Sequence, residues 1–189
     1  GAALRYFQDE FYIWQRDHWA RVPDREIRAR LTRFLQLSRL RVTSRYLQDV
    51  LANLKGEIVL SNWDQQLPLW VPDEQDGVVE PSPFISFRNG MLDRSQLLDA
   101  ECSELDMYEH DSQNFNLVVL PYDYDPEAEC PLWLQTLQEV FPQHAEGDRR
   151  IDVLQEFMGY TLIWHDTTFE KFLILHGQGA NGKSTILKV

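Results

Sequence analysis

The segment Gly177–Ser184 has the sequence GQGANGKS, between Lys171–His176 (KFLILH) and Thr185–Val189 (TILKV). Its eight residues fit the pattern G-x-x-x-x-G-K-[ST] at every fixed position. The apolar run before it predicts a buried strand, and the residues after it are suited to open a helix. A strand, a glycine-rich turn and a helix N-terminus are together typical of a phosphate-binding loop. The sequence therefore predicts the start of an α/β nucleotide-binding core.

Each fixed position of this loop has a chemical reason. The glycines allow a tight turn and let backbone N–H groups approach phosphates without a Cβ in the way. Lys183, the predicted catalytic residue, is expected to reach the β- and γ-phosphates of ATP, and the Ser184 hydroxyl is expected to hold Mg²⁺. The predicted nucleotide-binding residues are Gly177, Gly179, Asn181, Gly182, Lys183, Ser184 and Thr185. The alternative is a glycine-rich surface turn that fits the pattern by chance.

The position of the loop predicts an incomplete core. Five residues follow Ser184, too few to sustain an isolated helix, and a single strand is not a sheet. We therefore expect the chain to be a fragment of a longer protein, cut after the loop. The acidic residue that completes the Mg²⁺ site, the residue that positions water and any arginine finger are expected elsewhere.

The net charge of −12 hides a strong asymmetry. Residues 1–56 carry eleven basic and six acidic side chains, a net of +5, whereas residues 57–189 carry a net of −17. Ten of the eleven cations are arginines, whose planar guanidinium suits phosphates and interface carboxylates. Three interpretations stay open: a nucleic-acid surface, a face that docks on the acidic part of a neighbouring subunit, or a solvated helix surface. The candidate nucleic-acid contacts are Arg25, Arg28, Arg33, Arg41 and Arg45.

Other classes of function receive little support. No apolar stretch approaches the ~18 residues of a transmembrane helix, and no signal peptide pattern begins the chain. Cys102 and Cys130 lack metal-ligand spacing, which favours reduced thiols in a cytoplasmic protein. The acidic run over 99–111 resembles a metal or acid–base cluster, but without apolar surroundings it is better interpreted as a solvated loop.

Periodicity and turn residues predict an α+β N-terminal region with short strands, hairpins and helices. The expected strands cover 10–15, 18–22, 84–88, 91–92 and 117–120, with an Asn89-Gly90 turn between the third and the fourth. The expected helices begin at Asp24 as N-cap, near Thr43-Ser44 with Gly56 as C-cap, at Pro131, and at Asp148 as N-cap. The expected buried stripes are Ile27, Leu31, Phe34 and Leu35 in the first helix and Trp133, Leu134, Leu137, Val140 and Phe141 in the third.

Several pieces of the chain, taken in order, resemble a known family. They are Phe87–Asp93 (FRNGMLD), Tyr124–Trp133 (YDPEAECPLW), Leu154–Tyr160 (LQEFMGY) leading into the glycine-rich loop, and an early Trp19 followed by an arginine-bearing helix. Their order and spacing are similar to those of the N-terminal helicase-associated domain of viral and phage/plasmid primase-helicases. In that family a superfamily 3 helicase core follows this domain.

The resemblance implies a collar-like accessory domain over residues 1–145, whose basic part is residues 1–56. It implies that the truncated start of a P-loop (AAA+/superfamily 3) ATPase core covers residues 146–189. The intact parent would be an ATP- and Mg²⁺-dependent helicase, a homo-oligomer and hexamer when intact, that moves along single-stranded DNA during replication. It would act in the cytoplasm of a bacterial cell or phage-infected host, without a membrane partner.

Neither unwinding nor primer synthesis is expected of these 189 residues alone. Two alternatives stay open. The isolated chain could be a non-enzymatic module for oligomerisation or DNA binding, or the loop could belong to another P-loop NTPase or kinase.

Overall fold

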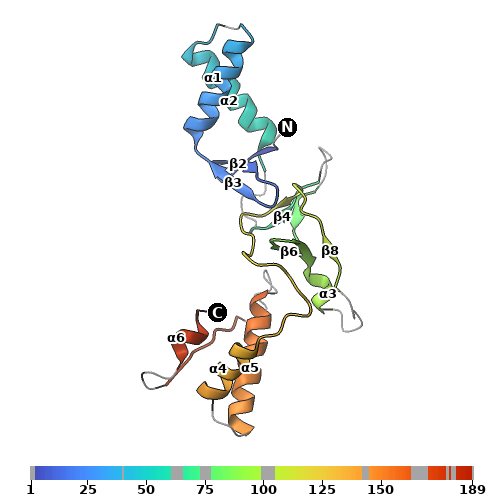
Figure 1. Ribbon diagram of the computed structural model, residues 1–189. Helices are drawn as coiled ribbons and strands as arrows, with labels where there is room; N and C mark the ends of the chain where they lie inside the picture. Colours follow the sequence, from blue (N-terminus) through green and yellow to red (C-terminus); the bar gives the residue numbers. More distant parts are fainter. Residues whose placement is uncertain are drawn as a thin grey trace. The chain divides into compact units, whose positions relative to one another are not determined.

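The computed structural model describes residues 3–39, 41–60, 66–72, 78–98, 105–141, 145–162, 170–177, 179 and 182–188. The chain separates into two compact units, Gly1–Tyr124 and Asp125–Val189. Within the described residues there are six helices and small antiparallel sheets (Figure 1), which confirms the predicted α+β class of the N-terminal region. The predicted domain division at residue 145 stays a prediction. None of the described helices is both long and apolar enough to cross a membrane.

The first sheet is an antiparallel meander in the order β1-β2-β3. Its strands are β1 (Leu4–Phe7), β2 (Glu10–Trp14) and β3 (Trp19–Val22). The sequence predicted β2 and β3 but not β1. The turn before β2 consists of Gln8 and Asp9, with φ values of 46° and 64°. Two consecutive positive φ angles are usually signalled by Asn-Gly or Asp-Gly, and neither pair is present here.

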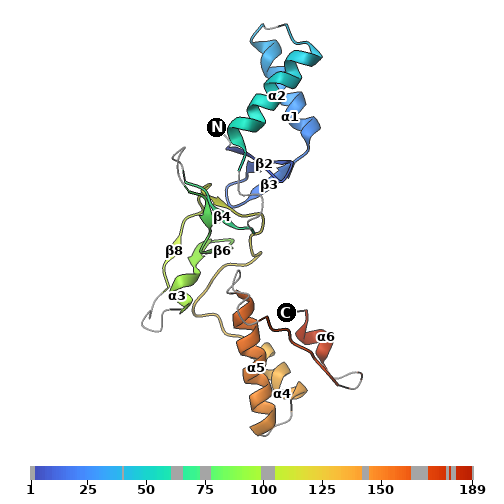
Figure 2. The ribbon, with the colours of Figure 1, turned by 180° about the vertical axis from the view of Figure 1, so that it is seen from behind.

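Two helices follow this sheet and lie side by side in both ribbon views (Figures 1 and 2). They are α1 (Asp24–Leu37) and α2 (Ser44–Ile58). Both predicted starts are confirmed, but the predicted caps differ. Asp24 is the first helical residue rather than the N-cap. Gly56 lies inside α2 rather than at its end. The helix extends to Ile58, because the Ile58 side chain packs against the core cluster of this unit.

Thr43 caps α2 through its side chain, whose Oγ1 accepts a hydrogen bond from the Tyr46 N–H at 3.2 Å. We expect Thr43→Ala to lower the free energy of unfolding by about 1 kcal/mol, because the Tyr46 N–H loses this acceptor. Urea denaturation followed by circular dichroism measures the change. The control is Thr32→Ala. In the wild type the Thr32 hydroxyl donates to the Arg28 carbonyl within α1 and caps no helix. An equal loss in both variants would contradict the capping role.

Two further sheets and a short helix complete the first unit. One sheet has the order β5-β4-β9 and the strands β4 (Leu69–Trp70), β5 (Glu80–Pro81) and β9 (Asn114–Phe115). The other has the order β6-β7-β8 and the strands β6 (Phe84–Phe87), β7 (Gly90–Asp93) and β8 (Met107–Tyr108). The helix is α3 (Arg94–Leu98). The β6–β7 pair confirms the predicted hairpin.

The turn of this hairpin is Arg88-Asn89, one residue before the predicted Asn89-Gly90. Gly90 is the first residue of β7, with φ of 152°, and a Cβ there would lie 2.6 Å from the Tyr108 carbonyl oxygen of β8. The Asn89 side chain exchanges two hydrogen bonds of 2.9 Å with the backbone of Tyr124. Asn89 is therefore needed for its hydrogen bonds to Tyr124 and Gly90 for the close approach of β8, and the pair does not form the turn by itself.

The predicted strand over 117–120 is wrong. In this stretch, Leu120 alone forms a bridge, to Phe87, and Val118 is 72% exposed. The Val118 carbonyl accepts a hydrogen bond of 3.0 Å from the side chain of Asn116. A side chain that occupies a backbone acceptor competes with a strand ladder, which explains why this apolar run is not a strand.

The core of the first unit consists of two clusters of buried side chains. One contains Phe7, Tyr12, Trp19, Leu60, Leu69, Val71 and Phe115, and joins the first sheet to β4 and β9. The other contains Phe11, Val22, Ile27 and Leu51, and joins the first sheet to α1 and α2. The first sheet therefore carries core side chains on both faces. It positions the α1–α2 pair against the remainder of the unit.

The second unit contains α4 (Pro131–Val140), α5 (Ala145–Leu162) and α6 (Lys183–Ile186). Pro131 occupies the predicted first turn of its helix, whereas Asp148 lies in the first turn of α5 rather than at its cap. Leu137, Leu154 and Ile186 form the core. Leu134, predicted to be buried, is 53% exposed.

The predicted strand over 171–176 does not form a ladder with any described residue. Leu173 and Leu175 pack against the helical core, while Phe172 and Ile174 are 78% and 71% exposed. This alternation is the pattern of a strand with one covered face. A ladder needs a neighbouring strand, and the described residues of this unit contain none. The structure therefore does not show the start of an ATPase core.

Candidate functional site

The glycine-rich loop leads directly into α6. Gly182 precedes the helix in the left-handed conformation, with φ of 80°. Its carbonyl accepts hydrogen bonds of 3.0 Å from the N–H groups of Thr185 and Ile186, which closes the first turn. The Lys183 ammonium donates a hydrogen bond of 2.9 Å to the Gly177 carbonyl. The first and seventh positions of the motif are thus brought together.

The remaining predicted loop residues are accessible where they are described. Gly177, Gly179, Ser184 and Thr185 are exposed, and Gly182 and Lys183 are half-buried. Asn181 lies outside the described residues, so its predicted contact has no structural counterpart. The donor types fit a phosphate: one ammonium and one hydroxyl side chain stand next to a turn that holds two glycines.

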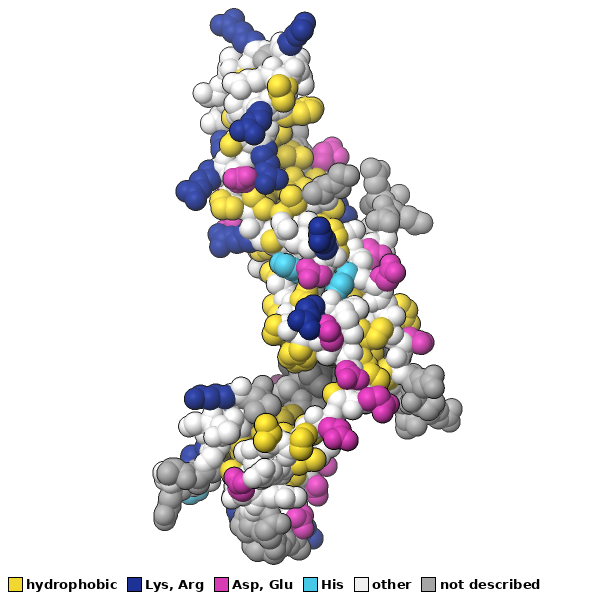
Figure 3. All heavy atoms as spheres, viewed as in Figure 1, with side chains coloured by type: hydrophobic (Ala, Val, Ile, Leu, Met, Phe, Trp, Pro, Cys, Tyr) yellow, Lys and Arg dark blue, Asp and Glu magenta, His cyan; other side chains and the backbone are white. Residues whose placement is uncertain are grey.

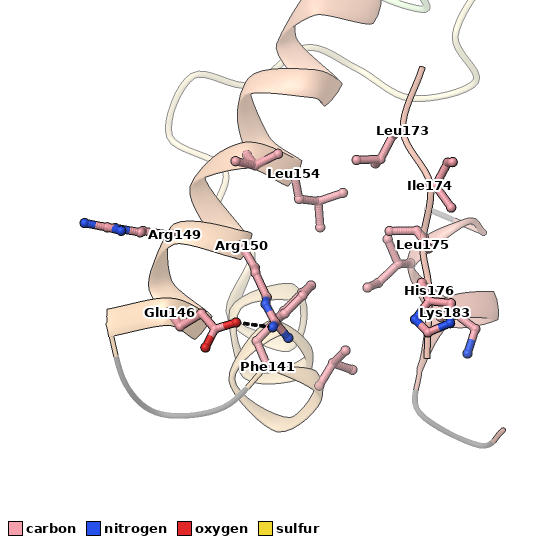
Figure 4. Close-up of a pocket in the computed structure, with 13 residues that line it drawn as sticks. Phe141, Glu146, Arg149, Arg150, Leu154, Leu173, Ile174, Leu175, His176 and Lys183 are labelled. Carbon is pink, nitrogen blue, oxygen red and sulfur yellow. Dashed lines mark hydrogen bonds and ion pairs between the residues drawn. The ribbon is translucent and has the colours of Figure 1, made fainter. Parts of the chain in front are cut away.

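A hollow of about 630 Å³ lies beside this loop in the second unit (Figure 4). Apolar side chains of α4, α5 and the 173–175 segment line it together with Ile186. Five ionisable side chains also line it: Glu146, Arg149, Arg150, His176 and Lys183. The volume lies within the range of small-molecule pockets. Of the predicted site residues, Lys183 is the one that lines this hollow.

Sequence reasoning did not single out the basic residues of α5. Arg150 forms an ion pair with Glu146, one helical turn earlier, as the dashed line in Figure 4 marks. An exposed pair of this kind contributes little to stability. Arg149, Arg150 and Lys183 line the same hollow because the 173–175 segment packs in the core of this unit, which no spacing rule in the sequence predicts.

The five arginines predicted to contact nucleic acid all lie on or between α1 and α2. Arg25, Arg28 and Arg33 are on α1, Arg41 is in the connection, and Arg45 is in the first turn of α2. Arg28 bonds with Asp24, one turn earlier, and this hydrogen bond is the main cause that lowers the pKa of the Asp24 carboxyl. Within the described part of the chain, the other four form no ion pair with a carboxylate.

Lys55, by contrast, is part of the internal framework of this unit. Its ammonium donates a hydrogen bond of 3.1 Å to the Tyr6 hydroxyl and lies 3.6 Å from Asp24 Oδ1. It also lies 4.6 Å from the ring centroid of Tyr6 and 5.2 Å from that of Phe11. The bond to Tyr6 is the main cause that raises the Lys55 pKa. This cation ties α2 to the sheet.

Comparison with protein families identifies the first three quarters of the chain. The model of the family described as D5 N terminal like matches residues 2–142. The chain belongs to this family. D5 N-terminal-like domains are the N-terminal region of D5-like primase-helicase proteins. No curated protein matches the chain.

The family match confirms the coarser part of the resemblance and covers all three sheets, α1, α2 and all five predicted arginines. The glycine-rich loop lies after the D5 N-terminal-like region, so its assignment rests on its own residues. The MgATP contacts predicted for the loop stay a prediction.

Proposed function

We propose that the chain is part of a replicative primase-helicase of the phage/plasmid and poxvirus type, whose superfamily 3 motor binds and hydrolyses ATP to move along and unwind DNA. One observation carries the proposal: a complete GQGANGKS loop follows a D5 N-terminal-like region in the same chain. The intact protein is proposed to form a hexamer on single-stranded DNA, in the cytoplasm of a bacterial cell or phage-infected host.

The chain's own residues have distinct tasks in this proposal. The Lys183 ammonium exchanges the Gly177 carbonyl for phosphate oxygens, which offer a stronger, charge-assisted hydrogen bond. Ser184 supplies a hydroxyl oxygen for Mg²⁺, and Gly182 keeps the backbone close to the phosphates. The bound Mg²⁺ would neutralise charge on the transferred phosphoryl group. The hydrolytic water and the transition-state charge need partners outside these residues.

A second function is favoured by the exposed 171–176 segment. Because this segment has no strand partner among the described residues, the isolated chain is proposed to act as an oligomerisation or DNA-binding module without ATPase activity. The family match makes an unrelated P-loop kinase or NTPase the weaker alternative.

The proposal is tested by titrating fluorescent ATP with Mg²⁺ into the chain and into its Lys183→Ala variant. We expect Lys183→Ala to weaken binding about 10- to 100-fold, as the loss of a charge-assisted hydrogen bond implies. Lys188→Ala is the matched control, because Lys188 follows α6 and lies outside the motif. Equal affinity of the wild type and Lys183→Ala would overturn the assignment of the loop.

A further inference from the structure

The middle of the α1–α2 pair is a basic stretch in which acids of the first turn of α1 pair with two of the six arginines. From Ile27 to Gln48 the sequence contains six arginines and no aspartate or glutamate. Arg28 bonds with Asp24 and Arg30 with Glu26 at 3.1 Å. Arg33, Arg39, Arg41 and Arg45 are exposed and form no ion pair within the described part of the chain. Figure 3 shows the dark blue side chains gathered over these helices.

Exposed apolar side chains lie among these arginines. Phe34 is 64% exposed, Leu37 is 78% exposed and Tyr46 is 40% exposed. Arg30, Arg33, Phe34 and Leu37 have the spacing i, i+3, i+4, i+7, which places them on one side of α1. A solvated helix surface needs no exposed phenylalanine. The combination indicates a binding face rather than a surface kept soluble by charge.

Two adjoining hollows flank Phe34 on this side of α1. The first, of about 280 Å³, is apolar and lies over the first sheet, lined by Leu4, Ile13, Ile27, Leu31 and Leu54 together with Arg30 and Phe34. The second, of about 580 Å³, is lined by Glu26, Ala29, Arg30, Arg33, Phe34 and Leu37. Phe34 and Arg30 border both. An apolar hollow thus adjoins a hollow lined by two guanidinium groups and the Glu26 carboxylate, with an aromatic ring between them. A phosphate on Arg30 would replace its exposed ion pair with Glu26.

We infer that this side of α1 binds single-stranded nucleic acid, with an unpaired base against Phe34 and the flanking phosphates on Arg30 and Arg33. Aromatic side chains bind unpaired bases by stacking, and arginines bind the phosphates that connect them. In a duplex the bases are already stacked on one another, so Phe34 distinguishes single strands from duplexes. The inference rests on the proposed function for its biological setting, and on these residues for its chemistry.

A competing occupant is the acidic part of a second copy of this chain, since residues 57–189 carry a net charge of −17. Carboxylates would satisfy the arginines equally well. They leave unexplained why an exposed phenylalanine stands between an apolar and a basic hollow. The test below separates the two occupants.

The test is fluorescence anisotropy of a labelled oligothymidylate, about 20 nucleotides long so that it exceeds the site of one module, titrated with the 189-residue chain at several salt concentrations. No ATP is added. We expect Phe34→Ala to weaken binding about 5- to 100-fold, the effect of one lost stacked base, with an unchanged salt slope. We expect Arg33→Gln to reduce the slope of log K against log salt by about 0.7, the value of one phosphate contact on a single strand.

Matched controls come from outside the α1–α2 pair and the loop: Tyr122→Ala, at an aromatic side chain that is 53% exposed, and Lys188→Gln, at an exposed cation. Both are expected to bind like the wild type, and because no ATP is added, failure of the ATP assignment leaves this test intact. The inference is overturned if the oligonucleotide does not bind, or if Phe34→Ala behaves like Tyr122→Ala. It is also overturned if duplex DNA binds as tightly as the single strand. Self-association that Arg33→Gln abolishes, measured by sedimentation without DNA, would assign the surface to a second copy instead.

Discussion

Trp19→Ala is expected to lower the free energy of unfolding of the first unit by about 3–5 kcal/mol, the range for removal of a fully buried tryptophan. Trp19 is 1% exposed, and its ring centroid lies 5.3 Å from that of Phe115 and 5.7 Å from that of Trp14. Its indole N–H donates to the Ser112 carbonyl at 3.2 Å. The substitution therefore leaves a cavity and an unpaired carbonyl where the first sheet meets β9.

Hydrogen exchange of the β2 and β9 amides in increasing urea measures this loss, because the two units of the chain need not unfold together. Trp19→Phe removes the indole N–H but keeps an aromatic ring that fills most of the space. It should therefore lower the free energy of unfolding by less than half as much as Trp19→Ala. Val118→Ala, at a side chain that is 72% exposed, should change stability by less than about 0.5 kcal/mol. A loss under about 1 kcal/mol for Trp19→Ala would contradict its place at the junction.

The α1–α2 pair shows how far periodicity predicts structure. Both helices begin where turn residues predict, although Asp24 does not cap α1, and Ile27 and Leu35 are buried as predicted. Phe34 was predicted to be buried but is 64% exposed. It lies on the same side of α1 as Ile27, about 10 Å further along the axis at 1.5 Å per residue. Periodicity predicts on which side of a helix a residue lies. It does not predict how far along the helix the neighbouring element extends to cover that side.

The glycine-rich loop shows a different limit of prediction from sequence. The contacts with ATP and Mg²⁺ that the motif predicts stay a prediction, and the Lys183–Gly177 hydrogen bond brings the first and seventh positions of the motif together. Neither the hollow beside it nor the place of Arg149, Arg150 and His176 in its lining could be predicted, because both depend on how the 173–175 segment packs in the second unit. The strand predicted over 171–176 has the right alternation, but pairing depends on a neighbour that local sequence does not specify.

Gly182→Ala is expected to destabilise the loop and α6 by about 2–5 kcal/mol, from two independent causes. A Cβ at this position would lie 2.3 Å from Val140 Cγ2 of α4, and overpacking of this kind costs roughly 1–3 kcal/mol. In addition, φ of 80° is left-handed, a region that costs an alanine roughly 1–2 kcal/mol. Because α6 spans Lys183–Ile186, a single turn, it should detach from α4 and withdraw Ile186 from the core.

Detachment also predicts a functional result, because Lys183 would lose its place beside Gly177. Affinity for fluorescent ATP should fall to that of Lys183→Ala, and the Ile186 and Leu187 amides should lose protection in hydrogen exchange.

Two further variants are controls for this prediction. Gly159→Ala on α5 has nothing within 4 Å of its Cβ, and alanine is favoured in a helix by about 0.5–1 kcal/mol, so this variant should be more stable than the wild type. Adding Val140→Ala to Gly182→Ala should relieve the contact but not the backbone strain, and therefore restore part of the protection. Complete recovery would show that φ contributes nothing, and no recovery would show that Gly182 does not pack against α4.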